Sequence, residues 1–213
     1  MFKGTQVIGT RDIAKDPKLM AQMDAIKDEI RKEEQKQIQR LRLGQISDLK
    51  DAKKRTNRHV ALLQQLAEVE KESRSLIVQS EFEKIYTNAG ASGMNAGTTE
   101  DYTMYFINVP ANKLELWFWM ESDRLLNPVF REFYSEREVV FEERRRRTDS
   151  TPTGKFEVEF NARFWTSSPY PWPTVGWPSD LEGLTRKEAL DYFALHYAPN
   201  NIVACLVGDF DPA

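Results

Sequence analysis

The stretch that decides the fold is residues 90–109, GASGMNAGTTEDYTMYFINV. Its second part, 103–109, is rich in β-branched and aromatic residues, and this composition predicts a strand. Gly90 and Gly93, with two small residues between them, are typical of a turn, and residues 94–98 predict a shorter strand after it. The middle of the chain is therefore expected to contribute strands to a sheet.

Four helical segments are expected after the strand 103–109. Apolar residues at helical spacing, with prolines near the ends of the segments, predict them. They cover residues 110–125, 131–148, 155–165 and 185–197. The last one has Thr185 as its N-cap and Glu188 three residues later, which is the spacing of a capping box.

The other apolar residues after position 110 are expected in the core. Trp117 and the aromatic residues that follow it favour core packing, and so do Trp172 and Trp177 in the proline-rich loop. The run 202–207, IVACLV, predicts a buried strand with Cys205 as a small core residue. Helices gathered against a mixed or antiparallel sheet indicate the α+β class.

Residues 11–75 have a different composition, because they are polar and almost free of aromatic side chains. Two apolar stripes at spacings of three and four predict a helical hairpin, with Gly44 ending the first helix and Ser47 as the N-cap of the second. His59 is expected to be exposed. The hairpin is either a solvated antiparallel coiled coil or an arm that binds a partner. The stripes contain Leu19, Met23, Ile26, Ile30, Ile38 and Leu41, then Ile46, Leu49, Val60, Leu63, Leu66 and Val69.

The composition excludes several kinds of site and partner. The net charge of -3 over 213 residues gives no overall basic field that would attract nucleic acid. One cysteine excludes an intrachain disulfide and a cysteine-rich zinc site, and the two histidines, His59 and His196, lie too far apart for a local metal motif. No run of about 18 apolar residues occurs, so no membrane span is expected.

Glutamates in the segment 131–148 are the candidate functional residues. Glu136 and Glu143 lie seven positions apart and share one helix face, whereas Glu138 and Glu142 lie four apart and share another. A carboxylate on a partly buried face needs a partner, a proton or a metal ion. Arginines of the same segment could instead neutralise these acids on a solvated helix, and the spacing alone leaves both interpretations open.

Five blocks of sequence carry a family resemblance. They are, in order, MFKGT, GASGMNAGTTEDYTMYF, PANKLELWFWMESDRL, EREVVFEERR and PYPWPTVGWPSDLEGLT with HYAPNNIVACLVGDFDP. Together they resemble the N-terminal domain of the insulinase, pitrilysin and mitochondrial processing peptidase family. The resemblance covers residues 1–10 and 76–213, so it implies an insulinase-like α+β peptidase domain interrupted by a helical-hairpin insertion at 11–75.

The resemblance implies a zinc metalloendopeptidase and gives roles to matching residues. Members of the family are inverted zincins, whose His-x-x-Glu-His motif supplies two zinc ligands and a general base. In EREVVFEE, Glu143 matches the third zinc ligand and Glu136 the supporting catalytic acid seven residues earlier. Asn95 and Ala96 match the edge at which the family binds its peptide substrate as an added strand, a mode that grips main-chain groups.

The sequence departs from the family at its start. Relatives carry His-x-x-Glu-His immediately before the residues that resemble Met1 to Thr5, and the 213 residues do not contain that motif. His59 lies in the insertion and His196 in a helix whose resemblance is structural, so neither replaces a ligand. The isolated chain is therefore expected to be inactive and to bind zinc weakly. The homologous C-terminal half, or a partner subunit, is expected to close the substrate chamber.

Two other functions stay open from the sequence. The chain could belong to a non-catalytic, peptidase-like scaffold or partner subunit, or it could act as an interaction protein through the hairpin at 11–75. Retention of both Glu136 and Glu143 favours activity of the parent protein. Bacterial relatives with this kind of body are often exported, which implies a periplasmic location for the parent.

Overall fold

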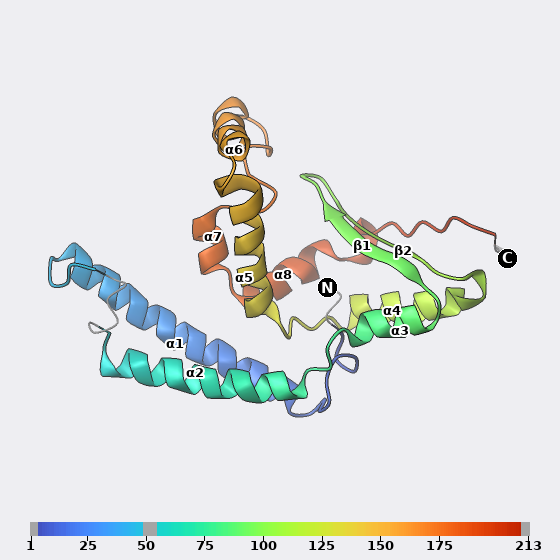
Figure 1. Ribbon diagram of the computed structural model, residues 1–213, viewed down its shortest axis with the longest axis horizontal. Coiled ribbons are helices and arrows are strands. Elements are labelled where there is room, and N and C mark those ends of the chain that lie inside the picture. Colours follow the sequence, from blue (N-terminus) through green and yellow to red (C-terminus); the bar gives the residue numbers. More distant parts are fainter. Residues whose placement is uncertain (1–3, 49–54, 210–213) are drawn as a thin grey trace. The chain divides into compact units, whose positions relative to one another are not determined.

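A helical hairpin forms most of Gln6–Gln79, one of the two compact units into which the chain divides. The computed structural model describes residues 4–48 and 55–209. Helix α1, Asp16–Arg42, lies beside helix α2, Asn57–Leu76, and the two run antiparallel (Figure 1). An isolated bridge between Thr10 and Ile77 joins the chain entering α1 to the chain leaving α2. The predicted helical hairpin is therefore present, and whether it is an insertion into a peptidase domain stays a prediction.

The ends of the two hairpin helices follow local backbone chemistry. Gly44, just after α1, adopts a φ of 70°, a left-handed conformation that favours glycine, as its predicted role requires. The prediction of Ser47 as the second N-cap is wrong, because α2 begins ten positions later. Thr56 is the N-cap, and its Oγ1 accepts a hydrogen bond from the backbone N–H of His59 at 3.0 Å. Leu49 of the predicted second stripe lies outside the described residues.

The hairpin buries polar side chains in its half near the connecting segment. His59 is 4% exposed, so the prediction that it is exposed is wrong, and its Nδ1 lies 3.2 Å from Nε2 of Gln37. Glu33 is also buried and accepts hydrogen bonds from Lys36 and from Thr56, which hold its pKa below the ordinary value. The buried face of α1 therefore keeps its spacing of three and four residues but passes from apolar residues to Glu33 and Gln37.

A two-stranded antiparallel sheet lies in the other unit, Met1–Thr5 with Ser80–Ala213. Strand β1, Ser92–Thr98, pairs with strand β2, Thr103–Asn108, after the short helix α3, Glu81–Asn88. Both strands were predicted, and the register is irregular between Ser92 and Asn95. Gly93 sits in that irregularity with a φ of 66°, the conformation expected at a β-bulge.

Five α-helices follow the sheet among the described residues. The helices predicted at 110–125, 131–148, 155–165 and 185–197 are all present with small shifts of their ends, whereas α7 was not predicted. Thr185 and Glu188 form the predicted capping box at the start of α8. The helices are α4 (Leu114–Leu126), α5 (Phe133–Arg144), α6 (Pro152–Phe164), α7 (Pro178–Gly183) and α8 (Arg186–His196).

The predicted buried strand at 202–207 is not formed. Val203 and Val207 are each 93% exposed, and Cys205 is exposed rather than a core residue. A strand is stable only when its main-chain groups are paired, and no strand among the described residues pairs with this segment. The described structure is thus mostly helical with a small antiparallel sheet, which is compatible with the α+β class and the mixed or antiparallel sheet that were expected.

The core of the sheet-containing unit is small and lies between α3 and α4. Phe82, Tyr86 and Met120 are its most buried large side chains. The prediction that the tryptophans pack in the core is wrong for Trp119 and Trp172, which are more than half exposed. Among the described residues, no helix combines the length and apolar character needed to cross a membrane.

Replacing His59 by alanine is expected to destabilise the hairpin by about 1–3 kcal/mol, because Gln37 would keep a buried amide without its partner. Urea unfolding of the chain, followed by far-ultraviolet circular dichroism together with hydrogen exchange of the α1 and α2 amides, measures the loss. The matched control is Gln35→Ala, a change at an exposed position on α1. Equal stability of the two variants would contradict the role given to His59.

Candidate functional site

Two arginines fix one face of α5 to the segment that follows α6. Arg137 donates from Nη1 to the carbonyl oxygens of Glu182 and Leu184, both at 3.1 Å. Arg144, which is 6% exposed, donates from Nη1 to the carbonyl oxygen of Gly176 at 2.7 Å. The two arginines lie seven positions apart, so they share one side of the helix. Their anchoring role was not predicted, although the seven-residue spacing was visible in the sequence.

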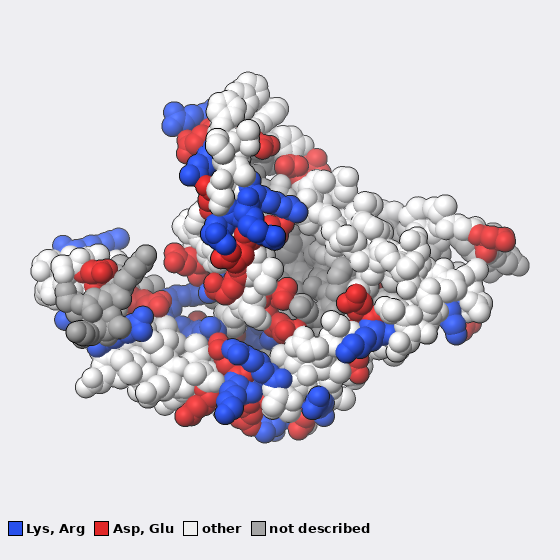
Figure 2. All heavy atoms as spheres, in the orientation of Figure 1, with Lys and Arg blue, Asp and Glu red and all other residues white. Residues whose placement is uncertain are grey.

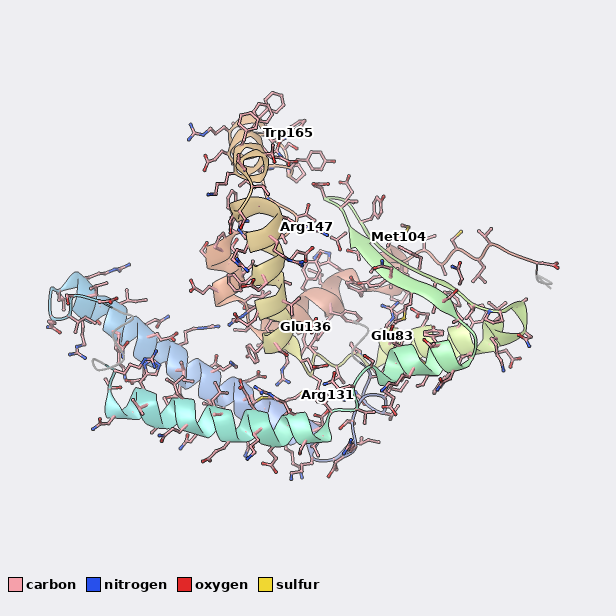
Figure 3. The ribbon with its side chains drawn as sticks, viewed as in Figure 1. Glu83, Met104, Arg131, Glu136, Arg147 and Trp165 are labelled. Carbon is pink, nitrogen blue, oxygen red and sulfur yellow. The ribbon has the colours of Figure 1, made fainter. Side chains whose placement is uncertain are left out.

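Glu136 and Glu143 lie one position before these arginines and therefore share the neighbouring side of α5. Both side chains are half-buried. Oε1 of Glu143 lies 2.9 Å from Nη1 of Arg147, one turn further along the chain. Glu136 lies near the N-terminal end of α5, whereas Arg147 lies beyond the C-terminal end of this helix (Figure 3). The spacing of seven residues corresponds to about 10 Å along the helix axis, so these two carboxylates do not meet.

The other two glutamates of α5 are exposed and paired with arginines. Glu142 accepts from Arg145 at 2.6 Å and 2.9 Å, and this contact holds the pKa of Glu142 below its ordinary value. Glu138 lies 3.5 Å from Arg137. Figure 2 shows basic side chains gathered where α5 passes into α6, with acidic side chains beside them. Arginine pairing therefore does not separate the glutamates, because Glu143 is also paired, with Arg147. Glu136 and Glu143 differ from Glu138 and Glu142 in being half-buried, which keeps them as the candidates for a site.

The backbone changes its winding directly after Glu143. Residues Arg145–Asp149 form a π-helical turn between α5 and α6. Such turns are rare, and they occur frequently at functional sites. Thr151 then caps α6 by accepting a hydrogen bond from the backbone N–H of Gly154 at 3.2 Å, so Pro152 and Gly154 begin a helix here. The turn places Arg147 against the carboxylate of Glu143.

The described residues do not by themselves form a zinc site. No group of three histidine, cysteine, aspartate or glutamate side chains among them could hold a metal ion. Zinc needs at least three protein ligands in a catalytic site, and the two half-buried carboxylates of α5, Glu136 and Glu143, lie too far apart to bind one ion together. His59 is held by Gln37 in the hairpin unit, and His196 is exposed with its ring 4.2 Å from the ring of Tyr192. The ligand role expected for Glu143 therefore stays a prediction, and it would need further ligands.

The start of the described chain is held close to the start of α5. Nη2 of Arg131, a buried side chain, donates to the carbonyl oxygen of Thr5 at 3.0 Å. Thr5 is fully buried and also forms an isolated antiparallel bridge with Pro128. Arg131 lies just before α5 (Figure 3). The block that contains Thr5 is thus held to the segment 128–131, which lies just before the block that begins with Glu136.

The predicted peptide-binding residues lie on an exposed strand. Asn95 and Ala96 are both exposed on β1, where they pair with Phe106 and Tyr105 of β2. Hydrogen-bonded and non-hydrogen-bonded pairs alternate along an antiparallel ladder, and the backbone N–H of Thr99 donates to the carbonyl oxygen of Tyr102. Thr99 and Tyr102 therefore form a hydrogen-bonded pair. Three positions back along β1, the pair of Ala96 with Tyr105 is non-hydrogen-bonded.

The main-chain groups of Ala96 and Thr98 therefore face away from β2, and we call them the β1 edge. The sheet has no further strand at this edge among the described residues. The N–H of Ala96 donates to Oδ1 of Asn95 at 2.8 Å, so the side chain of Asn95 covers one donor of the edge. Such an edge can accept an added strand once that local bond is exchanged.

The sheet face beside the β1 edge is apolar. Met104 and Phe106 alternate with half-buried residues along β2 and are 52% and 47% exposed (Figure 3 labels Met104). The loop between β1 and β2 is held by two residues that follow α6. Oη of Tyr170 donates to both carboxylate oxygens of Asp101, and Thr174 donates to Glu100. No local pattern in the sequence predicts these contacts, since they join residues about 70 positions apart.

Comparison with known proteins finds relatives over part of the chain. No protein-family model matches the chain. Over 131 residues it is 37% identical to the zinc protease PqqE of Helicobacter pylori (strain ATCC 700392 / 26695), a match that covers 61% of this chain and 29% of that protein. Over 120 residues it is 28% identical to the uncharacterized zinc protease ML0855 of Mycobacterium leprae (strain TN), covering 55% of this chain and 27% of that protein.

The chain is related to zinc proteases. A solved structure, that of a protease from Helicobacter pylori, is similar with a TM-score of 0.53 and 35% sequence identity, over 57% of this chain and 30% of that one. These matches confirm the resemblance to an insulinase/pitrilysin-like zinc protease family over part of the chain. The chain spans less than a third of the length of these relatives.

Removing the side-chain oxygen of Asn95 is expected to expose the amide of Ala96. Asn95→Ala should raise the hydrogen-exchange rate of that single amide by about 2- to 12-fold, the equivalent of one net hydrogen bond. Asn95→Asp is the matched control, because it keeps an acceptor in the same place. Equal exchange of the Ala96 amide in the unaltered chain and in both variants would show that Asn95 does not cover the edge.

Proposed function

We propose that this chain is part of a zinc metalloendopeptidase of the insulinase family, to which it contributes a peptide-binding edge and one zinc ligand. The observation that carries the proposal is the pair Glu136 and Glu143 on one side of α5, within a chain related to zinc proteases. The arginines on the adjacent side of the helix are bound to main-chain carbonyls, so they hold the helix without using these two carboxylates.

Glu143 is the proposed ligand and Glu136 the proposed supporting acid. The roles differ because the two carboxylates are about two helix turns apart and cannot bind one ion together. Glu143 is partly accessible, and its carboxylate lies next to Arg147. The side chain of Arg147 is largely exposed and can turn away at little cost in free energy. A bound zinc ion supplies polarisation of the scissile carbonyl and of a water molecule. The proposed role of Glu136 is to orient neighbouring groups around the zinc ligands.

The remaining ligands and the general base are proposed to come from outside these 213 residues. The two histidines of the chain are not the proposed ligands, because His59 is buried in the hairpin unit and His196 lies on α8 beside Tyr192. The isolated chain is accordingly proposed to hold zinc weakly and to cleave no peptide. The rest of the protein, as a homologous C-terminal half or a partner subunit, would close the chamber around the substrate.

The proposed substrate is an extended segment of a peptide or protein. The β1 edge offers the outward N–H and C=O groups of Ala96 and Thr98, and a strand added there would be gripped through its main chain. Met104 and Phe106 give the neighbouring sheet face an apolar surface that suits apolar side chains of such a strand. This arrangement binds many sequences, since the main chain is common to all peptides.

A non-catalytic scaffold is the alternative function for the same elements. It would keep the β1 edge but would not need an accessible Glu143. A docking role of the hairpin is a separate alternative that does not depend on the β1 edge or on Glu143. The hairpin forms a compact unit of its own with internal ion pairs such as Arg58 with Glu29. Deleting that unit while keeping peptidase activity, with loss of a co-purifying protein, would favour an added docking role.

Metal analysis of the full-length protein tests the proposed ligand. Glu143→Ala is expected to abolish stoichiometric zinc after dialysis, and Glu136→Ala to weaken zinc binding by about 10- to 100-fold, as for a group behind the ligands. Glu142→Ala is the matched control, because that neighbouring glutamate is exposed and paired with Arg145. Full zinc in the Glu143 variant, or tight stoichiometric zinc in the isolated 213-residue chain, would contradict the proposal.

Backbone-modified peptides test binding at the β1 edge. An unstructured peptide is expected to bind the 213-residue chain and to lower hydrogen exchange at Ala96 and Thr98. Two N-methylated versions of this peptide are compared, one methylated at the odd positions and the other at the even positions. Only one version should lose binding, because an added strand turns every second N–H toward the edge. Equal affinity for both N-methylated series would exclude strand addition.

A further inference from the structure

The side chain directly across from Ala96 is not solvent-facing like its neighbours. Tyr105 occupies the paired position on β2 and is half-buried, whereas Met104 and Phe106 on either side of it are about half exposed. Side chains of a non-hydrogen-bonded pair lie close together on the same face of the sheet. The position of Tyr105 therefore affects the position of Ala96.

The hydroxyl group of Tyr105 is tied to the end of α8. Its Oη lies 2.7 Å from Oη of Tyr197, the residue that follows the last turn of α8. The ring of Tyr197 stacks on the ring of Phe193, with centroids 4.5 Å apart and planes 9° from parallel. Phe193 is 6% exposed, so the half-buried ring of Tyr197 is packed against a buried ring.

The ring of Tyr105 is also covered by a buried cation. The guanidinium carbon of Arg124 lies 4.5 Å from the ring centroid, which is a cation–π contact. Arg124 is 5% exposed and donates from Nε to Glu121 at 2.9 Å. Glu121 also accepts a hydrogen bond from Oη of Tyr86, a fully buried residue of α3, at 3.0 Å. Strand β2 is thus connected through one residue to α3, α4 and α8.

The protonation state of these hydroxyl groups is stable. Burial raises the pKa of Tyr105 further above its ordinary value, with the contact to Tyr197 adding to the effect, and burial likewise raises the pKa of Tyr86. Both hydroxyl groups therefore keep their protons at neutral pH. Either the Tyr105 or the Tyr197 hydroxyl group can donate the hydrogen bond that joins them.

We propose that Tyr105, Tyr197 and Arg124 form a clamp that positions the β1 edge for an incoming peptide strand. The inference rests on the proposed binding of peptide at this edge and goes beyond it by naming the residues that hold the edge in place. None of the three contacts the peptide. A two-stranded hairpin is marginally stable in water by itself, so β1 needs an anchor through β2. An edge held in its binding geometry loses less conformational entropy when a strand is added.

Phenylalanine variants isolate the hydroxyl pair with little risk to the fold. In the 213-residue chain, Tyr105→Phe is expected to speed exchange of the Asn95 and Gly97 amides, which face β2, by roughly 2- to 12-fold, and to weaken binding of a fluorescent extended peptide by a similar factor. Exchange in α1 and α2 should be unchanged, because they belong to the other compact unit. Tyr102→Phe, which removes an exposed hydroxyl group from the same hairpin, is the matched control.

A second variant tests whether one hydrogen bond is responsible. Tyr197→Phe should reproduce the effects of Tyr105→Phe, and the double variant should weaken peptide binding no more than either single change, since both hydroxyl groups belong to one bond. Additive losses in the double variant would overturn the clamp. So would a Tyr105→Phe chain that binds peptide as the Tyr102→Phe chain does, whether or not its amides exchange faster. If the unaltered chain binds no peptide, the proposed function itself fails, and that result is distinct from the others.

Discussion

The larger unit depends on the buried guanidinium group of Arg124. A buried charge is costly unless it is paired and its donors are used, and Arg124 meets both needs through Glu121 on the same helix and the ring of Tyr105. Glu121 in turn binds Tyr86 from α3. The small sheet and two helices are therefore held by one charged group in a unit whose apolar core is modest. The position of the β1 edge, and with it the proposed peptide binding, follows from this contact.

Helix α5 uses one seven-residue spacing for two purposes. Arg137 and Arg144 attach the helix to main-chain carbonyls of the segment between α6 and α8. Glu136 and Glu143, each one position earlier, lie on the side that these attachments leave accessible. A helix held by backbone oxygens on one side can present carboxylates on the next without losing its position. This arrangement is compatible with the proposed role of the two glutamates in a metal site, a role that comes from the resemblance to zinc proteases.

The sequence predicted the features that local chemistry determines. The strands at 94–98 and 103–109, the left-handed Gly44 and the capping box of Thr185 with Glu188 were all readable, because each depends on residues close together in the chain. Burial of His59 depends on Gln37 of the other hairpin helix, and the run 202–207 stays unpaired because a strand needs a neighbour that the described chain does not provide. The contact of Tyr105 with Tyr197 spans 92 positions, and no local pattern reports it.

The central claim is that α5 supplies a zinc ligand to a protease site. Diffraction data collected on crystals of the full-length protein above and below the zinc absorption edge test it most directly. The account predicts an anomalous peak within about 2.0–2.2 Å of a carboxylate oxygen of Glu143, with Arg147 turned away and Glu136 outside bonding distance. A zinc peak bound by other residues, with Glu143 still paired to Arg147, would contradict it.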